Sequence, residues 1–189
     1  MRIFFTRKGL KALISAITND NATLQKQGWE EFAMQMEPGI VKSQDSLDAI
    51  RWNILGQTYV PKVLTEDCFS WHATLPPGTF VPPHIHPEQD EFLYILEGKF
   101  DFILDGQEAI GEPGDFVKLP RGLPHGIFNK SDSTIKTLFW VTPALRLYDL
   151  FWEINNMGPE PNPAEVVAVS AAHAIDFLPP PDEDTGGEV

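Results

Sequence analysis

The chain has 189 residues, a length that suits one domain with appendages, and its 42% of hydrophobic residues are enough for a core. Its 27 acidic and 14 basic side chains give a formal net charge of −13, which repels phosphate groups. Nucleic acids and anionic membrane surfaces are therefore disfavoured as partners.

Two features of the sequence favour a cytoplasmic protein. Cys68 is the only cysteine and cannot form an internal disulfide, which indicates a reducing compartment. The first residues read MRIFFTRKGLKALISAI, and Lys8 and Lys11 interrupt the apolar run that a secretory signal or a membrane-spanning helix requires. We therefore expect neither kind of segment at this end of the chain.

Residues 1–50 are predicted to form an N-terminal extension that is partly helical. Apolar residues recur at the spacing of one helical face over about residues 8–18. The segment QGWEEFAMQM reads as a second short helix or a strand, and Pro38-Gly39 closes it. The predicted helical face consists of Leu10, Leu13, Ile14 and Ile17.

Residues 51–143 read as a series of short strands. The apolar pieces RWNILGQTYV, CFSWHATL, DEFLYIL, KFDFIL, DFVKLP, HGIFN and TIKTLFWV alternate with turn sequences such as PPG, PPH, LDGQ and PRGLP. Many short strands at a spacing of roughly 8–12 residues are typical of an antiparallel sandwich or barrel. The sequence therefore predicts an all-β domain here.

After this domain the apolar period becomes helical. In ALRLYDLFWEINN the apolar residues form one stripe. PAEVVAVSAAHAI reads as another short helix, with Pro163 near its first turn. We expect these helices, within residues 144–178, to pack on the barrel, and residues 179–189 to form a flexible acidic tail. The stripe of the first helix consists of Leu147, Leu150, Phe151 and Ile154.

Two of the five histidines lie two positions apart in the stretch VPPHIHPEQDEFLYIL. In a strand such residues point to the same side, so His84 and His86 can approach one metal ion. The chain turns at PEQD, and a hairpin there returns Glu91 to the histidine pair. His125 begins a later strand after a turn rich in Pro and Gly. Three imidazoles and one carboxylate suit one divalent transition metal ion with open positions for water or substrate.

The offsets between these residues resemble the two conserved motifs of the cupin superfamily. The resemblance is close over residues 78–129, and more loosely it extends to single-domain cupins that resemble quercetin 2,3-dioxygenase. The first motif matches at Gly78, His84, His86, Glu91 and Gly98. The second motif matches at Gly114, Pro120, Gly122, His125 and Asn129.

The resemblance implies a fold, a ligand set and an activity. The fold would be a double-stranded β-helix, or jelly roll. The metal ligands would be His84, His86, Glu91 and His125, and the ion could be Fe, Mn, Ni, Co, Cu or Zn. By analogy with quercetinase-like enzymes, Glu91 would also be catalytic, taking a proton from the substrate.

The expected activity is that of a dioxygenase, which would combine O2 with a small aromatic or enolisable substrate. Two alternatives stay open because one fold hosts many functions. The metal could serve an isomerase, lyase or cyclase that uses no O2. The domain could also bind a small molecule without turnover.

Other residues are assigned by their position in the predicted strands. Phe92 and Tyr94 alternate with Glu91, so they point to the outside of the sheet, where they could contribute to a homodimer. His72 and His173 are expected to be structural or exposed, and Lys118 and Arg121 to lie at the surface.

The turn after the histidine pair is expected to be solvated, at Glu88, Gln89 and Asp90. Gln89 is the one residue of this turn that could contact a metal ligand.

Overall fold

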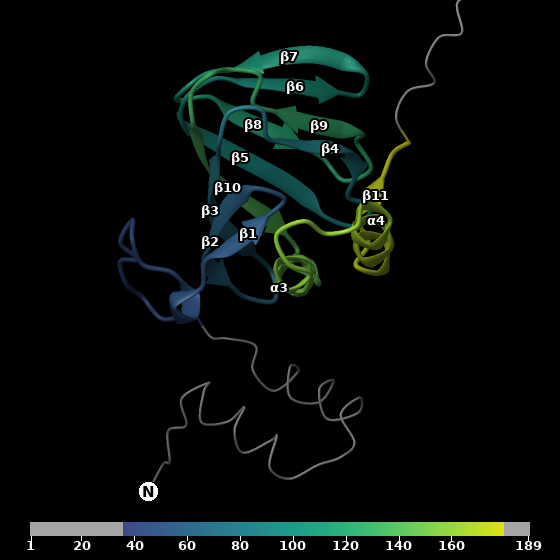
Figure 1. Cartoon of the computed structure of the whole chain (residues 1–189). Helices are drawn as coiled ribbons and strands as arrows, with labels where there is room; N and C mark the ends of the chain where they lie inside the picture. Colours follow the sequence, from purple (N-terminus) through teal and green to yellow (C-terminus); the bar gives the residue numbers. More distant parts are fainter. Residues whose placement is uncertain (1–35, 180–189) are drawn as a thin grey trace, which may run out of the picture. The chain divides into compact units, whose positions relative to one another are not determined.

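The computed structural model describes residues 36–179. The helix expected over residues 8–18 and the tail beyond residue 179 lie outside this range. The described part is built mainly of antiparallel strands, which form two sheets, and Figure 1 shows these sheets as the two layers of a sandwich. This is the jelly roll that the sequence predicts.

The first sheet has six strands in the order β1-β2-β3-β10-β5-β8. A short 3-10 helix, η1 (Leu47–Ala49), precedes it. Its strands are β1 (Trp52–Ile54), β2 (Gln57–Leu64), β3 (Phe69–Leu75), β5 (Asp90–Glu97), β8 (Phe116–Leu119) and β10 (Ile135–Thr142).

The second sheet has five strands in the order β11-β4-β9-β6-β7. Its strands are β4 (Phe80–Ile85), β6 (Phe100–Leu104), β7 (Gln107–Gly111), β9 (His125–Phe128) and β11 (Asp176–Phe177). The expected hairpin at LDGQ joins β6 to β7, and Asp105 and Gly106 both have positive φ, as a tight hairpin turn requires.

Three expectations about strands were wrong. RWNILGQTYV is two strands, because Leu55 and Gly56 have positive φ and reverse the chain between β1 and β2. PPH is not a turn: Pro82 and Pro83 lie within β4, at a register irregularity where strand pairing does not need their missing N–H groups. The series of apolar pieces omits β7, although a hairpin at LDGQ requires a strand there, because β7 buries only Gly111 fully and shows no apolar alternation.

The core fills the space between the sheets and continues to the C-terminal helices. Trp71 of β3 stacks on Phe139 of β10 with ring centroids 5.2 Å apart, and Phe151 meets Trp71 edge-on at 5.2 Å. Phe151 belongs to α3 (Leu147–Asn156), whose predicted apolar stripe is buried. This helix is therefore part of the core rather than an addition to its surface.

A second helix, α4 (Pro163–Ala172), follows and leads to β11. Asn162 caps it by accepting a hydrogen bond from the Ala164 backbone N–H, and β11 pairs with β4. In Figure 1, α3 lies beside β1 and α4 lies beside β11, which agrees with their contacts. Of the helices in residues 36–179, none combines the length and apolar character that crossing a membrane requires.

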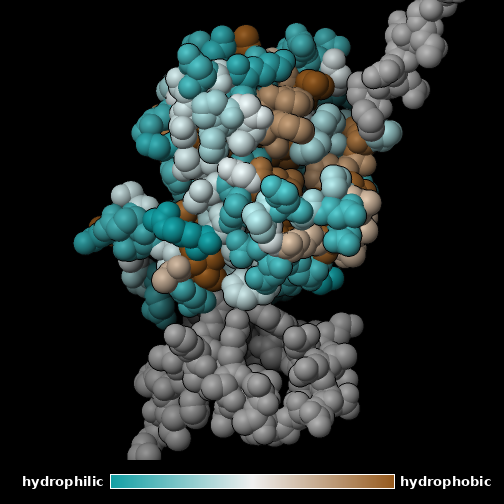
Figure 2. Space-filling model, in the orientation of Figure 1, coloured by the Kyte–Doolittle hydropathy of each residue, from teal (hydrophilic) through white to brown (hydrophobic). Residues whose placement is uncertain are grey.

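Figure 2 shows one largely hydrophilic face with apolar atoms gathered over β4 and β9 and beside α4. Phe80 of β4 is 49% exposed and stacks on Phe128 of β9 at 5.9 Å. Phe102, by contrast, is buried in the core. The second sheet therefore presents an aromatic pair to solvent on two of its neighbouring strands, β4 and β9.

The outer face of the first sheet carries a second group of aromatic side chains. Phe92 stacks on Trp140 at 5.6 Å, and Phe116 meets Trp140 edge-on at 5.3 Å. Tyr94 is 40% exposed, so Phe92 and Tyr94 point outward as their parity with Glu91 predicts. The homodimer that this face suggested stays a prediction.

Gly98 is expected to tolerate alanine less well than Gly106, although both have positive φ. A left-handed residue other than glycine costs about 1–2 kcal/mol at either position. At Gly98 an added Cβ would also lie 2.9 Å from Ile135 Cγ1 and 3.1 Å from its Cα, whereas nothing lies within 4 Å at Gly106. We expect Gly98→Ala to lower the free energy of unfolding by about 1–3 kcal/mol more than Gly106→Ala, the usual cost of overpacking.

Urea denaturation of the two variants, compared with the unmodified protein, measures this difference. Equal losses of stability would show that β10, which carries Ile135, can shift away from Gly98 at little cost.

Candidate metal centre

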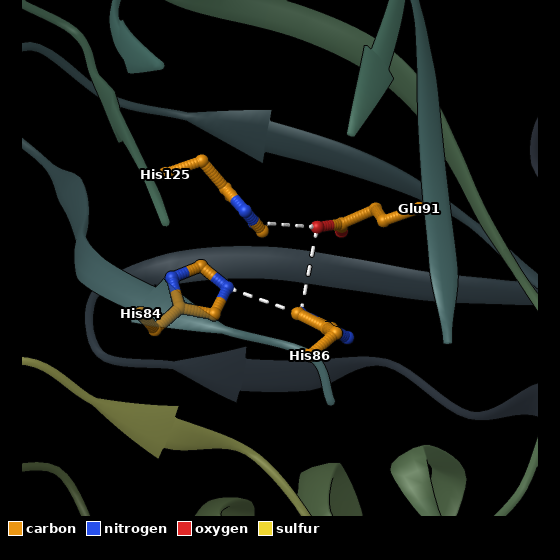
Figure 3. Close-up of side chains that lie close together, drawn as sticks. All are labelled: His84, His86, Glu91 and His125. Atoms are coloured by element: carbon orange, nitrogen blue, oxygen red, sulfur yellow. Dashed lines mark hydrogen bonds and ion pairs between the residues drawn. The ribbon is translucent and has the colours of Figure 1, made fainter. Parts of the chain in front are cut away.

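Four ionisable side chains from different strands meet between the two sheets (Figure 3). His84 lies on β4 and His125 on β9, directly opposite each other in the second sheet. His86 follows β4, and Glu91 comes from β5 of the first sheet. All four are at most 4% exposed. We call this group the tetrad.

The donor atoms of the tetrad point at a common centre. The Nε2 atoms of His84 and His86 are 3.1 Å apart, and Nε2 of His125 lies 3.1 Å from Oε2 of Glu91. Oε2 of Glu91 lies 3.5 Å from Nε2 of His86. One donor atom from each residue lies within 4.8 Å of all the others. This spacing could hold one metal ion.

The opposite ring nitrogens show that the tetrad fits a metal. Nδ1 of His84 donates to the Pro82 carbonyl at 2.8 Å, and Nδ1 of His125 donates to the Leu123 carbonyl at 2.9 Å. A neutral imidazole with its proton on Nδ1 has a lone pair on Nε2. These bonds therefore aim unprotonated nitrogens at the centre, which is how metal-binding histidines are oriented.

Gln89 orients the third imidazole, so the expectation of a solvated turn was wrong for this residue. Gln89 is 2% exposed, and its Oε1 accepts a hydrogen bond from Nδ1 of His86 at 3.2 Å. Its Nε2 donates to the carbonyls of Pro143 and Ala144 at 2.9 and 2.7 Å. The turn after the histidine pair is thus fixed to the end of β10.

The turns before β5 and β9 are joined to each other. Arg121 and Asp90 form an ion pair at 2.7 Å, and the Arg121 backbone N–H also donates to the Asp90 carboxylate. The Gly122 N–H donates to the His86 carbonyl at 2.9 Å. Arg121 is therefore a half-exposed residue, as expected, but it helps to hold the turns that carry Glu91 and His125.

Burial and mutual charge set the protonation of the tetrad. Burial, together with the neighbouring imidazoles, lowers the pKa of His84 to about 3, and burial lowers the pKa of His86. Burial opposes ionisation of Glu91, but the three imidazoles outweigh it and lower the pKa of this carboxyl to about 2. Burial also opposes protonation of His125, yet its hydrogen bond to Glu91 raises the pKa of the imidazole. His125 is therefore the first ligand to take up a proton.

The remaining singled-out residues lie apart from the tetrad. His72 is a half-buried residue of β3. His173 is buried at the end of α4, where its Nδ1 donates to the Val169 carbonyl and its Nε2 accepts from Arg146. Cys68 is half-buried, and burial raises the pKa of its thiol, which does not favour a nucleophile.

A cavity of about 60 Å³ adjoins the tetrad. His84, His86 and Glu91 contribute to its wall, and most of the remaining wall is apolar side chains from the sheets and from α3. The other polar side chains of the wall are Gln57, Tyr59 and Ser170. Sequence reasoning missed these three, because they lie on β2 and α4, outside either motif, with no spacing that links them to the histidines.

Acidification is expected to weaken binding of Zn²⁺ or Co²⁺ to the tetrad. Because the pKa of His125 lies above the usual value of about 6.5, its proton already competes with a metal ion above that pH. Metal affinity should then fall about tenfold per pH unit as the pH is lowered through this pKa, since one proton must leave for each ion bound.

Competition with a coloured chelator across a pH series measures the affinity. His84→Ala is expected to abolish stoichiometric binding at every pH, whereas His72→Ala should leave both affinity and slope unchanged. A metal affinity independent of pH would contradict the assignment of the competing proton to His125.

The chain was compared with known families and relatives. Residues 71–142 match the model of the cupin domain. The tetracenomycin polyketide synthase protein TcmJ of Streptomyces glaucescens is 31% identical over 96 residues, which cover 51% of this chain and 63% of that protein. Quercetin 2,3-dioxygenase of Bacillus subtilis is 33% identical over 57 residues, or 30% of this chain and 17% of that protein. The chain thus spans less than two thirds of both curated relatives.

A solved structure supports the fold. An RmlC-like cupin from Shewanella frigidimarina superposes with a TM-score of 0.53 at 17% identity, over 61% of this chain and 99% of the other. At this identity the likeness concerns the fold alone. The matched domain, the two-sheet architecture and the converging tetrad together show that residues 71–142 form a cupin domain.

Proposed function

We propose that the protein is a metal-dependent enzyme, a dioxygenase that acts on a small enolisable substrate. The proposal depends on one observation above all, the convergence of three imidazole nitrogens and one carboxylate oxygen within 4.8 Å in the barrel interior. The similarity to quercetin 2,3-dioxygenase supports the reaction class. The adjoining cavity supports a small-molecule substrate.

The tetrad residues are suited to hold one divalent transition metal ion. His84 and His86 present unprotonated nitrogens, His125 does so once it gives up the proton that it shares with Glu91, and Glu91 supplies the negative charge. Bound there, such an ion would supply Lewis acidity toward a substrate oxygen and, where it is redox-active, reactivity toward O2.

Glu91 is the residue that would move the substrate proton. Within residues 36–179 it is the one carboxylate in the wall of the cavity, and its low pKa keeps it ionised at neutral pH. A substrate hydroxyl or an acidic C–H next to a carbonyl could transfer its proton to this oxygen. His125, 3.1 Å from Oε2, would stabilise Glu91 in whichever protonation state it takes. The apolar wall excludes water that would otherwise compete for the proton.

A second candidate is a reaction that uses the metal without O2, as in an isomerase, lyase or cyclase. The match to TcmJ, a polyketide synthase protein by name, covers 51% of the chain, against 30% for the match to the dioxygenase. The tetrad also accepts Zn²⁺, which is not redox-active. Either reaction would begin with the same proton transfer to Glu91.

Oxygen uptake is expected to separate the two candidates. Protein loaded with Fe²⁺, Mn²⁺, Co²⁺, Ni²⁺ or Cu²⁺ should consume O2 in proportion to an enolisable ketone such as acetylacetone, and Zn²⁺ should not support uptake. Metal analysis of the same samples and an oxygen electrode give the readout, and His84→Ala is the metal-free control. Turnover that continues under nitrogen, or with Zn²⁺, would favour the second candidate.

Glu91→Gln is expected to reduce turnover far more than it reduces metal content. The amide keeps the shape of the side chain, and the three imidazoles still supply most of the metal bonds. The amide cannot accept the proton, so turnover at full occupancy should fall by about 10²–10⁴-fold, the usual value of general-base catalysis.

The measurement is turnover with metal content determined in the same sample and excess metal supplied. Glu97→Gln serves as the matched control, because this carboxylate lies on the same strand and pairs with Lys136 at the surface, outside the cavity. Activity of Glu91→Gln that recovers in proportion to occupancy would rule out the role as a base.

A further inference from the structure

The cavity beside the tetrad has few hydrogen-bonding groups to offer a ligand. The Tyr59 hydroxyl donates to Oε1 of Gln57 at 3.1 Å, and Nε2 of Gln57 donates to the Phe80 carbonyl at 3.0 Å. The Tyr59 hydroxyl and both polar atoms of the Gln57 amide therefore already have hydrogen-bond partners in the protein. Among the described residues that line the cavity, this leaves two side chains outside the tetrad with an unused hydrogen-bonding group, Ser170 and Trp71.

Ser170 lies on the last turn of α4 and is completely buried. Its hydroxyl has no partner within the described part of the chain, although a buried hydroxyl without a partner costs stability. Trp71 also lines the cavity with an unpaired indole N–H, but Trp52 has the same unpaired group outside the cavity wall. The indoles therefore indicate nothing about a ligand, whereas Ser170 is the one unpartnered hydroxyl among the described residues of the wall.

The backbone around Ser170 is fixed in place. Its carbonyl accepts hydrogen bonds from the N–H groups of His173 and Ile175 at 2.9 and 3.0 Å. The His173 ring connects α4 to Arg146, just before α3, and β11 pairs with β4 a few residues later. The hydroxyl is thus held at the cavity by a helix whose C-terminal end is attached both to Arg146 and, through β11, to β4.

Charge and size restrict what the cavity can hold. Among the described residues no lysine or arginine lines it and Glu91 is the one carboxylate, so an anionic group placed away from the tetrad, such as a phosphate ester, would be unpaired there. A sugar would leave most of its hydroxyls without partners. A volume of about 60 Å³ holds roughly four to six groups of the size of water, at about 10–15 Å³ each.

We propose that Ser170 is a substrate-binding residue, and that the substrate is a short, uncharged hydroxy-ketone or enolisable dicarbonyl compound. One oxygen would lie at the tetrad and lose its proton there, and the carbonyl oxygen at the other end would accept a hydrogen bond from the Ser170 hydroxyl. The part played by the tetrad rests on the proposed function. The part played by Ser170 rests on its burial and its unused hydroxyl.

The test uses hydroxyacetone as the probe, which carries a carbonyl and a hydroxyl on neighbouring carbons. Isothermal titration of the metal-loaded protein measures its affinity. Ser170→Ala is expected to weaken binding about three- to tenfold, the value of one neutral hydrogen bond. Because this hydroxyl is unpaired, the variant should keep its metal and melt at the same temperature or a higher one. Hydroxyacetone phosphate should bind at least tenfold more weakly than hydroxyacetone.

Thr137→Val is the matched control, because it also removes a buried hydroxyl. The Thr137 hydroxyl donates to the Tyr94 carbonyl at 2.9 Å and does not line the cavity. This variant should lose stability and keep its affinity for the probe, the reverse of Ser170→Ala.

Unchanged affinity in Ser170→Ala, with the metal bound, would overturn the inference and show that the hydroxyl serves only a water molecule. Equal or tighter binding of the phosphate ester would overturn the ligand class. Wild-type protein that binds no metal would instead contradict the proposed function. In that case the affinities of metal-free wild type and metal-free Ser170→Ala for hydroxyacetone would be compared, and their ratio would still decide whether Ser170 binds the probe.

Discussion

The tetrad depends on the distance between the two sheets, because Glu91 comes from one sheet and the histidines from the other. Inward-facing residues on either side of the tetrad set this distance. Leu93 and Ile95 follow Glu91 on the inner face of β5, and Ile127 follows His125 on β9, and all three are at most 1% exposed. Close packing of this kind is not easily compressed, so it transmits the sheet spacing to the donor atoms.

Burying four ionisable groups opposes folding, and the hydrogen-bond pattern reduces that cost. His84 and His86 stay neutral, and Glu91 is ionised beside His125, so the interior holds at most one close pair of charges. A buried pair of this kind contributes little net stability, and one left without its partner is strongly destabilising. An ion that binds the folded state alone would add stability by mass action. The site is therefore built for occupancy rather than for the stability of the empty protein.

The sequence was most informative where function constrains spacing. His84, His86, Glu91 and His125 could be placed together because strand parity and one hairpin suffice to bring them to the same side of the barrel. The stripe on α3 was predictable for a similar reason, since helical period alone defines it. Gln89 and Ser170 could not be placed in this way. Gln89 contacts carbonyls that directly follow β10, and Ser170 lines a cavity with residues of β2, α3 and β11. These elements are distant from Gln89 and Ser170 in the sequence, and no local pattern encodes such contacts.

The difference between the tetrad and the rest of the cavity wall limits what can be inferred about this chain from its relatives. The family model matches residues 71–142, which include the whole tetrad, whereas Ser170, Phe177 and the α3 residues of the cavity wall lie beyond it. Phe177 of β11 lies 5.7 Å from the His84 ring, so the C-terminal segment closes the space directly beside a predicted ligand. The matched region can therefore support an inference about the metal, whereas the cavity wall is shared between this region and residues outside it. For that reason the name of the quercetin dioxygenase is a poor guide to what this cavity would bind.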